Sequence, residues 1–314
     1  MGQYLLRRVL LMAITLVGVT FLVFSILRMV PGGVENAILG EQATPEQFKI
    51  LRHQLGLDDP IPVQYVKWLK GVSHGDLGQS LVTHRIISND IRDRLPVTLQ
   101  LGLMALVVSI VIAIPVGLIA AIRQDTLGDY TARSFAIAAL SIPGFWIGTL
   151  VITFGARLFG YAPPLTYIAP WVAPFANLQI MIPPALILGA EQSGSVMRLT
   201  RTQMLDVLRQ DYIRTAWAKG LRERTLVWRH ALKNAAIPVL TLIGIRVPVL
   251  FGGTVILEQI FGVPGVGRFL ITAVNQRDFP AIQAVVLMIA IVVILSNLFV
   301  DLTYSVLDPR VKFS

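Results

Sequence analysis

The chain has 314 residues, of which 54% are apolar and 14% charged, and its mean hydropathy is +0.69. Because charged residues make up about a quarter of a typical soluble protein, this composition excludes a soluble globular protein and predicts an integral membrane protein. The net charge is +9, but a third of the basic residues fall in one loop and no basic surface interleaved with aromatic residues is visible, so we expect no nucleic-acid partner.

The amino terminus predicts an uncleaved first transmembrane helix. Arg7 and Arg8 precede a charge-free run over residues 9–27, which spans a bilayer core when a few flanking residues are added. No small-residue cleavage site follows before the Pro-Gly-Gly break at 31–33. We therefore assign residues 1–30 to the N-terminus and the first span, with the amino end in the cytoplasm.

Residues 31–95 differ in composition from the rest of the chain and form a predicted external segment. They hold seven basic and eight acidic residues, and long translocated segments escape the positive-inside bias. Two interpretations stay open for this segment. It is either a lip that receives a partner protein or a structural cap over the mouth of the membrane domain.

The remaining hydrophobic stretches predict five more spans within a core domain, residues 96–314. Between residues 158 and 190 the chain is uncharged but holds six prolines, which should prevent one continuous helix. We expect residues 161–179 to form an external hairpin or interfacial segment. The predicted spans are 97–122, with Pro115 as a tolerated kink; 134–156, interrupted at Pro143; a short span from Pro183 to about Met197; 236–257; and 281–307.

A polar loop, residues 198–235, separates the fourth and fifth predicted spans. From Arg198 to Lys233 it carries nine Lys or Arg residues against three acids, and one Arg at the centre of a membrane helix costs at least ~2.5 kcal/mol. The loop must therefore lie in water, on the cytoplasmic side. Six spans place both termini on that same side. A basic loop of this kind can serve as a topology determinant alone, or it can dock a partner.

The pattern inside the loop favours docking through a bent pair of short helices. Apolar and aromatic residues recur at every fourth position, which places each set on one side of a helix. Gly220 permits a left-handed turn before a second amphipathic run begins at Leu221, and Ala216 and Ala218 keep the elbow small. The two sets are Met204, Leu208 and Tyr212, and Ile213 and Trp217.

This stretch resembles the loop that permeases of bacterial ATP-binding-cassette importers insert into their ATPase subunits, a motif written EAA, three residues, then Gly. Counted back from Gly220, the EAA positions fall on Arg214, Thr215 and Ala216, so Ala216 alone matches the general form. The sequences YIRTA, AKGL and RHALKNAAIPV look instead like the dipeptide, oligopeptide and nickel branch. The opening helix, LGLDDPIPVQYVKWL, GDLGQSL and VDLTYSVLDPR resemble the same branch.

The resemblance implies a six-helix, all-α permease of the type I importer fold in the bacterial cytoplasmic membrane. Its expected partners are a second permease, usually a different chain, two ATPases, an external substrate-binding protein and membrane lipids. Its expected substrates are peptides or related small solutes such as nickel complexes. The expected ATPase-coupling residues are Arg214, Thr215, Ala216, Lys219, Gly220, Leu221 and Arg222.

No motif in the chain predicts catalysis. The sequence GxxxxGK[ST] does not occur, so we expect ATP and Mg²⁺ to act on the partner ATPases, with no cofactor bound by this chain. Cysteine is absent, and the four histidines are scattered without ligand spacing, so we expect neither a catalytic residue nor a metal site.

Polar residues at membrane depth need partners or water. Arg28, Glu191 and Asp301 lie near span ends, where snorkelling or structural pairs are expected, and Arg246 lies deeper. We interpret Arg246 as a candidate for the translocation path or for a pair with Glu191.

Two other function classes remain. A secondary transporter or channel would use buried acids and inverted repeats; the sequence holds few acids in its predicted spans and shows no repeat between its halves. A membrane scaffold would also need a docking loop.

Overall fold

The computed structural model describes residues 2–30, 35, 39, 43–54, 56–164 and 166–307. Over these residues the regular secondary structure is helical, apart from an isolated antiparallel bridge between Gln79 and Ile86. The chain divides into two compact units. The first comprises residues 1–98 and 264–295, and the second comprises residues 99–263 and 296–312.

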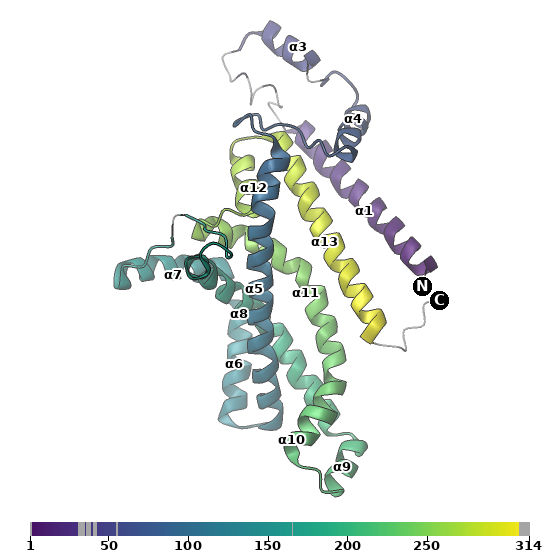
Figure 1. Cartoon of the computed structure of the whole chain (residues 1–314), viewed down its shortest axis with the longest axis vertical. Helices are drawn as coiled ribbons and strands as arrows, with labels where there is room; N and C mark the ends of the chain where they lie inside the picture. Colours follow the sequence, from purple (N-terminus) through teal and green to yellow (C-terminus); the bar gives the residue numbers. More distant parts are fainter. Residues whose placement is uncertain are drawn as a thin grey trace. The chain divides into compact units, whose positions relative to one another are not determined.

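The first unit is held together by aromatic packing and by one buried carboxylate. Tyr65 packs edge-on against Phe24, with ring centroids 5.5 Å apart, and its hydroxyl lies 2.8 Å from Thr20 Oγ1. Asp278 accepts bonds from Ser80 Oγ at 2.5 Å and from the Leu81 amide at 3.2 Å. The helices of this unit are α1 (Gly2–Met29), α3 (Pro45–Gln54), α4 (Ile61–Ser73), the start of α5 (Ile87–Ile122), α12 (Val266–Asn275) and most of α13 (Phe279–Leu307) (Figure 1).

The second unit is built around a long helix, α8, which packs against α6 and α11. Small residues let the backbones approach closely, as is common between membrane helices. At Gly189, for example, a Cβ would collide with Val108 and with the Ala105 carbonyl. The remaining elements of this unit are α6 (Leu127–Ser141), α7 (Gly144–Phe159), α8 (Pro174–Leu208), α9 (Asp211–Ala218), α10 (Glu223–Thr225), the π-helix η1 (Leu226–Ala231) and α11 (Leu232–Phe261).

Several described helices are long and apolar enough to cross a membrane. Within the described residues there are four such helices, or five if the bent pair α6 and α7 counts as one span. The four are Leu10–Met29, Ile87–Ile122, Glu223–Phe261 and Phe279–Val300. The prediction of several spans is thus confirmed, and the prediction of six stays a prediction.

The interruption predicted at Pro143 within the third span, 134–156, is confirmed. The chain bends by 94° between α6 and α7, with Ile142 and Pro143 in extended conformations. Proline lacks an amide hydrogen and pushes the residue before it out of the helical region. The interruption noted at Pro143 is therefore a sharp corner, and α6 itself begins at Leu127.

The predicted bounds of the fourth span, from Pro183 to about Met197, are wrong. Helix α8 begins at Pro174 and runs through Pro183 and Pro184 to Leu208, so the expected hairpin over 161–179 ends earlier than predicted. Pro174 fits the first turn, where its missing amide costs nothing. Pro184 is buried, and packing of this kind lets a membrane helix tolerate an interior proline.

Candidate functional site

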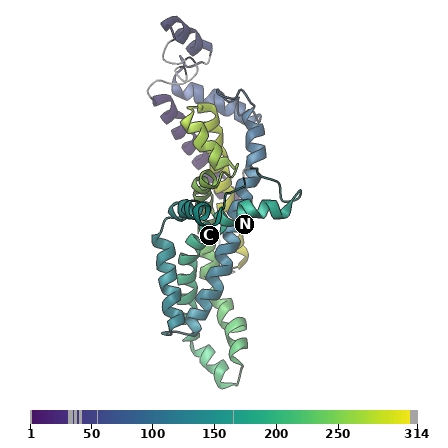
Figure 2. The ribbon, with the colours of Figure 1, turned by 90° about the vertical axis from the view of Figure 1, so that its left-hand side faces the viewer.

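The loop predicted to dock a partner lies at one end of the second unit. Helix α8 ends at Leu208, α9 follows from Asp211, and α10 begins at Glu223. We call residues 211–225 the α9–α10 hairpin. In both Figure 1 and Figure 2 this hairpin extends beyond the turn that joins α5 to α6 in the same unit.

The turn of the hairpin is built on Gly220, whose φ is +79°. The Leu221 amide donates to the Ala216 carbonyl at 3.3 Å, and the Gly220 amide donates to the Trp217 carbonyl at 2.9 Å. These two bonds form a Schellman motif, which closes a helix with a left-handed residue. The prediction of a left-handed turn at Gly220 is confirmed.

The second arm of the hairpin is not the separate short helix that we expected. The Arg222 carbonyl accepts the amides of Thr225 and Leu226 at 2.9 and 3.1 Å, and the chain then continues as α10, η1 and α11 without a break, from Glu223 to Phe261. No Gly or Pro stands between Glu223 and Pro238 to stop it. A π-helical turn of this kind is rare and often occurs at functional sites.

One side of α9 anchors the hairpin to the rest of the unit. Ile213 is 3% exposed and belongs to a buried cluster with residues from α5, α8 and α11, while Ala216 packs at its edge. Burying a side chain of this size contributes roughly 1.5–3 kcal/mol. The other members of the cluster are Leu118, Ala121, Met204, Leu226, Val227, Ala231 and Ala235.

The expected grouping of residues along this loop is partly wrong. Met204 and Tyr212 do not share a helix, because α8 ends at Leu208 and α9 starts at Asp211. Ile213 and Trp217 share α9, but Ile213 is buried and Trp217 is 61% exposed. Tyr212 instead accepts a hydrogen bond at 2.8 Å from Asn234 Nδ2, which ties α9 to α11.

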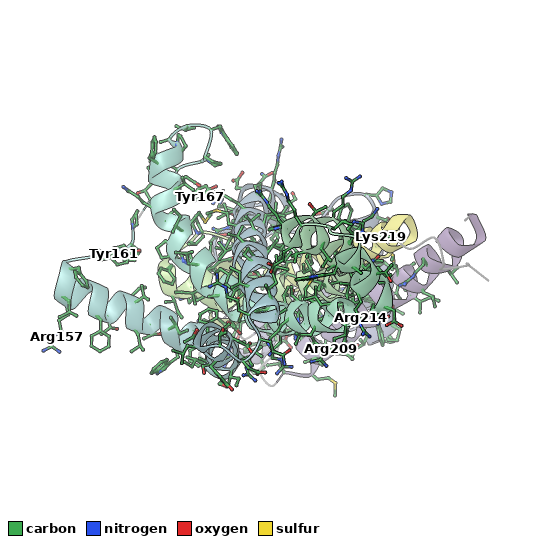
Figure 3. All side chains as sticks on the ribbon, turned by 90° about the horizontal axis from the view of Figure 1, so that it is seen from below. Arg157, Tyr161, Tyr167, Arg209, Arg214 and Lys219 are labelled. Carbon is green, nitrogen blue, oxygen red and sulfur yellow. The ribbon has the colours of Figure 1, made fainter. Side chains whose placement is uncertain are left out.

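The other side of the hairpin carries exposed cationic and aromatic residues. Arg214, Lys219 and Arg222 are all exposed, and Figure 3 shows Arg214 and Lys219 at the same end of the unit. The Arg214 guanidinium lies 3.5 Å from Asp211, but both side chains are more than three-quarters exposed, so the pair contributes little to stability. Sequence reasoning did not single out Trp217 as an exposed contact residue, although Trp and Arg are the residues that most often anchor interfaces.

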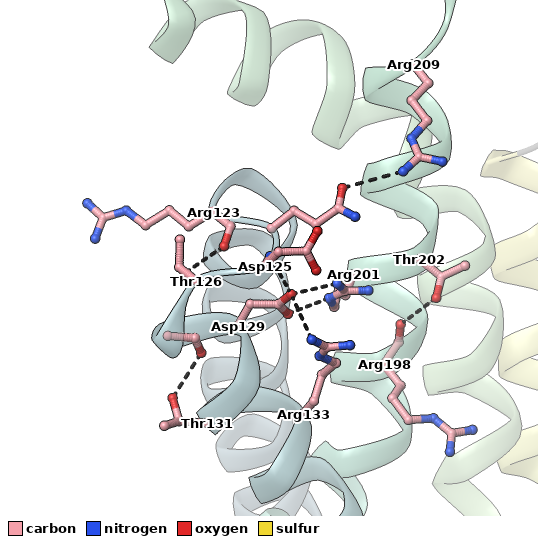
Figure 4. A network of polar contacts seen from close by, with 12 residues as sticks. Arg123, Asp125, Thr126, Asp129, Thr131, Arg133, Arg198, Arg201, Thr202 and Arg209 are labelled. Atoms are coloured by element: carbon pink, nitrogen blue, oxygen red, sulfur yellow. Dashed lines mark hydrogen bonds and ion pairs between the residues drawn. The ribbon is translucent and has the colours of Figure 1, made fainter.

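A buried ion pair stiffens the base from which the hairpin extends. Asp129 in α6 is fully buried and accepts two bonds from Arg201 in α8, from Nε at 2.6 Å and from Nη2 at 2.7 Å (Figure 4). It also accepts the Asp125 amide at 3.0 Å, and Arg133 Nη2 lies 3.6 Å away. This bidentate pair joins α6 to α8 about two turns before α8 ends at Leu208, and the sequence did not reveal it.

Arg246 is half-buried in α11, and among the described residues no ion pair joins it to Glu191. Of the two interpretations left open for Arg246, the pair with Glu191 is therefore not found. Glu191 instead accepts the backbone amide of Gly144, the first residue of α7, where helix N–H groups lack partners and the dipole favours a negative charge. A role for Arg246 in the translocation path stays a prediction.

Comparison with known proteins places the chain in one family along nearly its full length. Residues 113–313 match the family described as binding-protein-dependent transport system inner membrane component, and residues 1–102 match its N-terminal counterpart. The chain is 37% identical over 333 residues to the dipeptide transport system permease protein DppB of Alkalihalophilus pseudofirmus, covering 100% of both. It is 37% identical over 336 residues to DppB of Escherichia coli K12, covering 99% of both.

Solved structures show the same fold at low sequence identity. The chain aligns with the MetNI methionine ABC transporter in inward-facing conformations with a TM-score of 0.54 and 16% identity, covering 70% of this chain and 96% of that chain. It aligns with an amino acid ABC transporter with a TM-score of 0.52 and 16% identity, covering 76% and 97%.

Proposed function

The chain belongs to the family of binding-protein-dependent transport system inner membrane components, and on that premise we propose that it is the permease subunit through which an ATP-driven importer moves peptides into the cytoplasm. The observation that carries this proposal is the exposed basic hairpin, closed by Gly220 at φ +79° and anchored by the buried Ile213. The hairpin offers an ordered, charged surface that a separate ATPase subunit can bind.

The substrate class rests on the relatives. Two full-length relatives are dipeptide permeases, and a protein of Brucella abortus that is 37% identical over 313 residues is a putative peptide permease. We propose peptides as the substrate. The resemblance to the nickel branch also admits nickel complexes and related small solutes.

The proposed assembly contains a second permease, usually a homologous but different chain, two ATP-binding-cassette ATPases and an external substrate-binding protein. ATP and Mg²⁺ would bind to the ATPases. Arg214, Lys219 and Arg222 would contact the ATPase surface, while Thr215, Ala216, Gly220 and Leu221 hold the elbow in shape. The exposed Trp217 extends that contact surface.

The proposed membrane arrangement has six spans, with both termini in the cytoplasm. The α6–α7 pair supplies the third span and α8 the fourth. Helix α8 holds 35 residues, more than the ~20 that a bilayer core requires, and two of its four charged residues, Glu191 and Arg201, have partners. Residues 31–95 would then lie outside, either as a lip for the binding protein or as a cap over the pore mouth.

The proposed mechanism is alternating access, in which displacement passes from the ATPases to the spans through the hairpin. The hairpin is bonded to α11 through Tyr212 and Asn234, and its buried cluster includes residues of α5, α8 and α11. A movement of the hairpin therefore reaches three helices at once. Arg246, half-buried in α11, is the proposed residue of the translocation path.

Replacing Gly220 tests the proposal. Gly220→Val forces a β-branched residue into the left-handed region, which costs roughly 1–2 kcal/mol, while a Cβ there would meet no neighbouring atom. We expect normal membrane insertion, weaker co-purification of the ATPase subunits and loss of ATP-driven peptide uptake in reconstituted vesicles. Gly75→Val, with φ +82° and equally open space, is the matched control and should leave ATPase association unchanged.

Co-purification and uptake in reconstituted vesicles also distinguish an importer from the other two function classes. An importer requires ATPase subunits in fixed proportion and ATP hydrolysis that the loaded binding protein stimulates. Peptide uptake without any ATPase would support a secondary transporter or channel, and ATPase binding without any uptake would support a scaffold. Either result would contradict the proposed function.

A further inference from the structure

The apolar span that contains α11 begins with α10 and η1, and one side of this beginning is uncovered in the second unit. On that side Trp228 is 56% exposed, and Arg229 and Lys233 are exposed as well. The opposite side packs in the buried cluster that anchors α9, through Leu226, Val227, Ala231 and Ala235. One aromatic side chain and two cations are therefore turned away from the packed cluster.

The positive charge of this stretch is not cancelled. Between residues 222 and 233 the chain carries four basic residues and one acid, so its net charge is +3. The acid, Glu223, lies six residues before Arg229, and among the described residues no carboxylate forms an ion pair with Arg229 or Lys233. Both cations are therefore available to an anion from outside the chain.

Lys233 lies where the chain passes from its polar loop into the hydrocarbon layer. It is the last charged residue before an uncharged run from Asn234 to Ile245, and it belongs to the 39-residue apolar span Glu223–Phe261. At 1.5 Å per residue this span is roughly twice as long as the ~30 Å of a bilayer core, so its first turns extend into the headgroup layer. Tryptophan is enriched in that layer, and Trp228 precedes Lys233 by about one turn.

An exposed apolar surface begins one helical turn after the cations. Ile237 is 41% exposed and Leu240 is 39% exposed, and they follow Lys233 at the four- and three-residue steps that keep side chains on one side of a helix. A water-soluble partner would cover the cations but leave these apolar side chains uncovered. A phospholipid matches both parts, because its headgroup meets the charges while its acyl chains lie along the apolar residues.

We propose that Arg229 and Lys233 bind the headgroup of a membrane phospholipid that carries a net negative charge. Arginine and lysine both form charge-assisted hydrogen bonds to phosphate oxygens. Trp228 lies beside that headgroup, and Ile237 and Leu240 contact the acyl chains. Lipid binding of this kind is independent of the transported substrate and of the ATPase contact.

A lipid bound here would contact the base of the α9–α10 hairpin. Asn234 directly follows Lys233, and its Nδ2 donates to the Tyr212 hydroxyl of α9 at 2.8 Å. The π-helical turn η1 lies between the hairpin and α11, and such turns often occur at functional sites. We therefore expect the bound lipid to fix the hairpin relative to the surface of the bilayer.

The test uses the purified full-length chain in detergent, titrated with phosphatidylglycerol and followed by native mass spectrometry. We expect the double variant Arg229→Gln with Lys233→Gln to bind this lipid about 25-fold more weakly, since each basic residue at an anionic headgroup contributes about fivefold. Arg214→Gln with Lys219→Gln is the matched control. It removes two exposed cations of the same loop that stand before the apolar span begins, and it should bind lipid like the unchanged chain. Equal binding by the first double variant and the unchanged chain, or an equal loss in both double variants, would overturn the proposal.

Two measurements on the unchanged chain keep the proposal testable if the first double variant does not fold. Phosphatidylcholine has the same acyl chains but no net charge, so we expect it to bind about tenfold more weakly than phosphatidylglycerol. Glycerol 3-phosphate at the lipid's concentration should not displace the lipid, because it lacks the acyl chains. Equal binding of phosphatidylcholine would show that the cations do not select the lipid, and full displacement by glycerol 3-phosphate would assign the surface to a soluble phosphate. Either result would contradict the proposal.

Discussion

The α9–α10 hairpin and the helical base around Asp129 are both rich in arginine, but they use it in opposite ways. In the base, Arg201 makes two hydrogen bonds to the fully buried Asp129. In the hairpin, Arg214 lies 3.5 Å from Asp211, and their side chains are 78% and 96% exposed. The difference shows that one residue type can fix two helices together or remain available for a partner, depending on the burial of its acid.

The largest expected effect comes from removing the buried carboxylate. Asp129→Asn keeps the shape of the side chain but removes the buried negative charge that lies between Arg201 and Arg133. Breaking a buried ion pair on one side costs about 3–5 kcal/mol, so we expect a large drop in the midpoint of thermal unfolding in detergent, measured by circular dichroism.

Two variants sharpen this comparison. Asp211→Asn removes the exposed acid of the hairpin and should leave the unfolding midpoint nearly unchanged, because exposed pairs contribute about 0–1 kcal/mol. The double variant Asp129→Leu with Arg201→Met replaces the buried pair by apolar groups and should regain much of the lost stability. If Asp129→Asn and Asp211→Asn lowered the midpoint equally, the distinction between base and hairpin would fail.

A smaller effect is expected at the point where the hairpin joins its base. Ile213→Ala leaves a cavity in the cluster formed with Leu118, Met204 and Leu226. Buried Ile→Ala substitutions cost about 2–5 kcal/mol, and we expect the low end of that range because α9 lies at the edge of the unit, where the chain can relax. Limited proteolysis should cut the hairpin faster in this variant.

The control for this prediction lies on the same helix. Trp217→Ala removes a side chain of α9 that is 61% exposed, and it should leave the proteolysis rate unchanged. Equal protection in Ile213→Ala and the unchanged chain would mean that the buried cluster does not hold α9 in place.

The contrast between the two regions also shows what the sequence could and could not predict. The turn at Gly220 follows from a local preference, because glycine is the residue that enters φ > 0 without steric cost. The pairing of Asp129 with Arg201 spans 72 positions, and no periodicity states which acid meets which base. Proline was a good guide at one position and a poor one at another. Pro143 interrupts the third predicted span as expected, with a corner of 94°, whereas Pro183, the expected start of a span, lies inside α8, since packing lets a membrane helix tolerate an interior proline.

The smallest expected effect on stability, and the most specific effect on function, comes from the exposed arginine of the hairpin. Arg214→Ala should change the free energy of unfolding by less than about 0.5 kcal/mol, since surface substitutions away from packed features stay within that range. The same variant should weaken ATPase co-purification, because a charge that contributes nothing to the fold remains free to contact a partner. Arg157→Ala is the matched control: Arg157 lies in α7, apart from Arg214 in Figure 3, and its loss should change neither quantity. If Arg214→Ala left ATPase association unchanged and Arg157→Ala abolished it, the docking surface would lie on α7 and not on the hairpin.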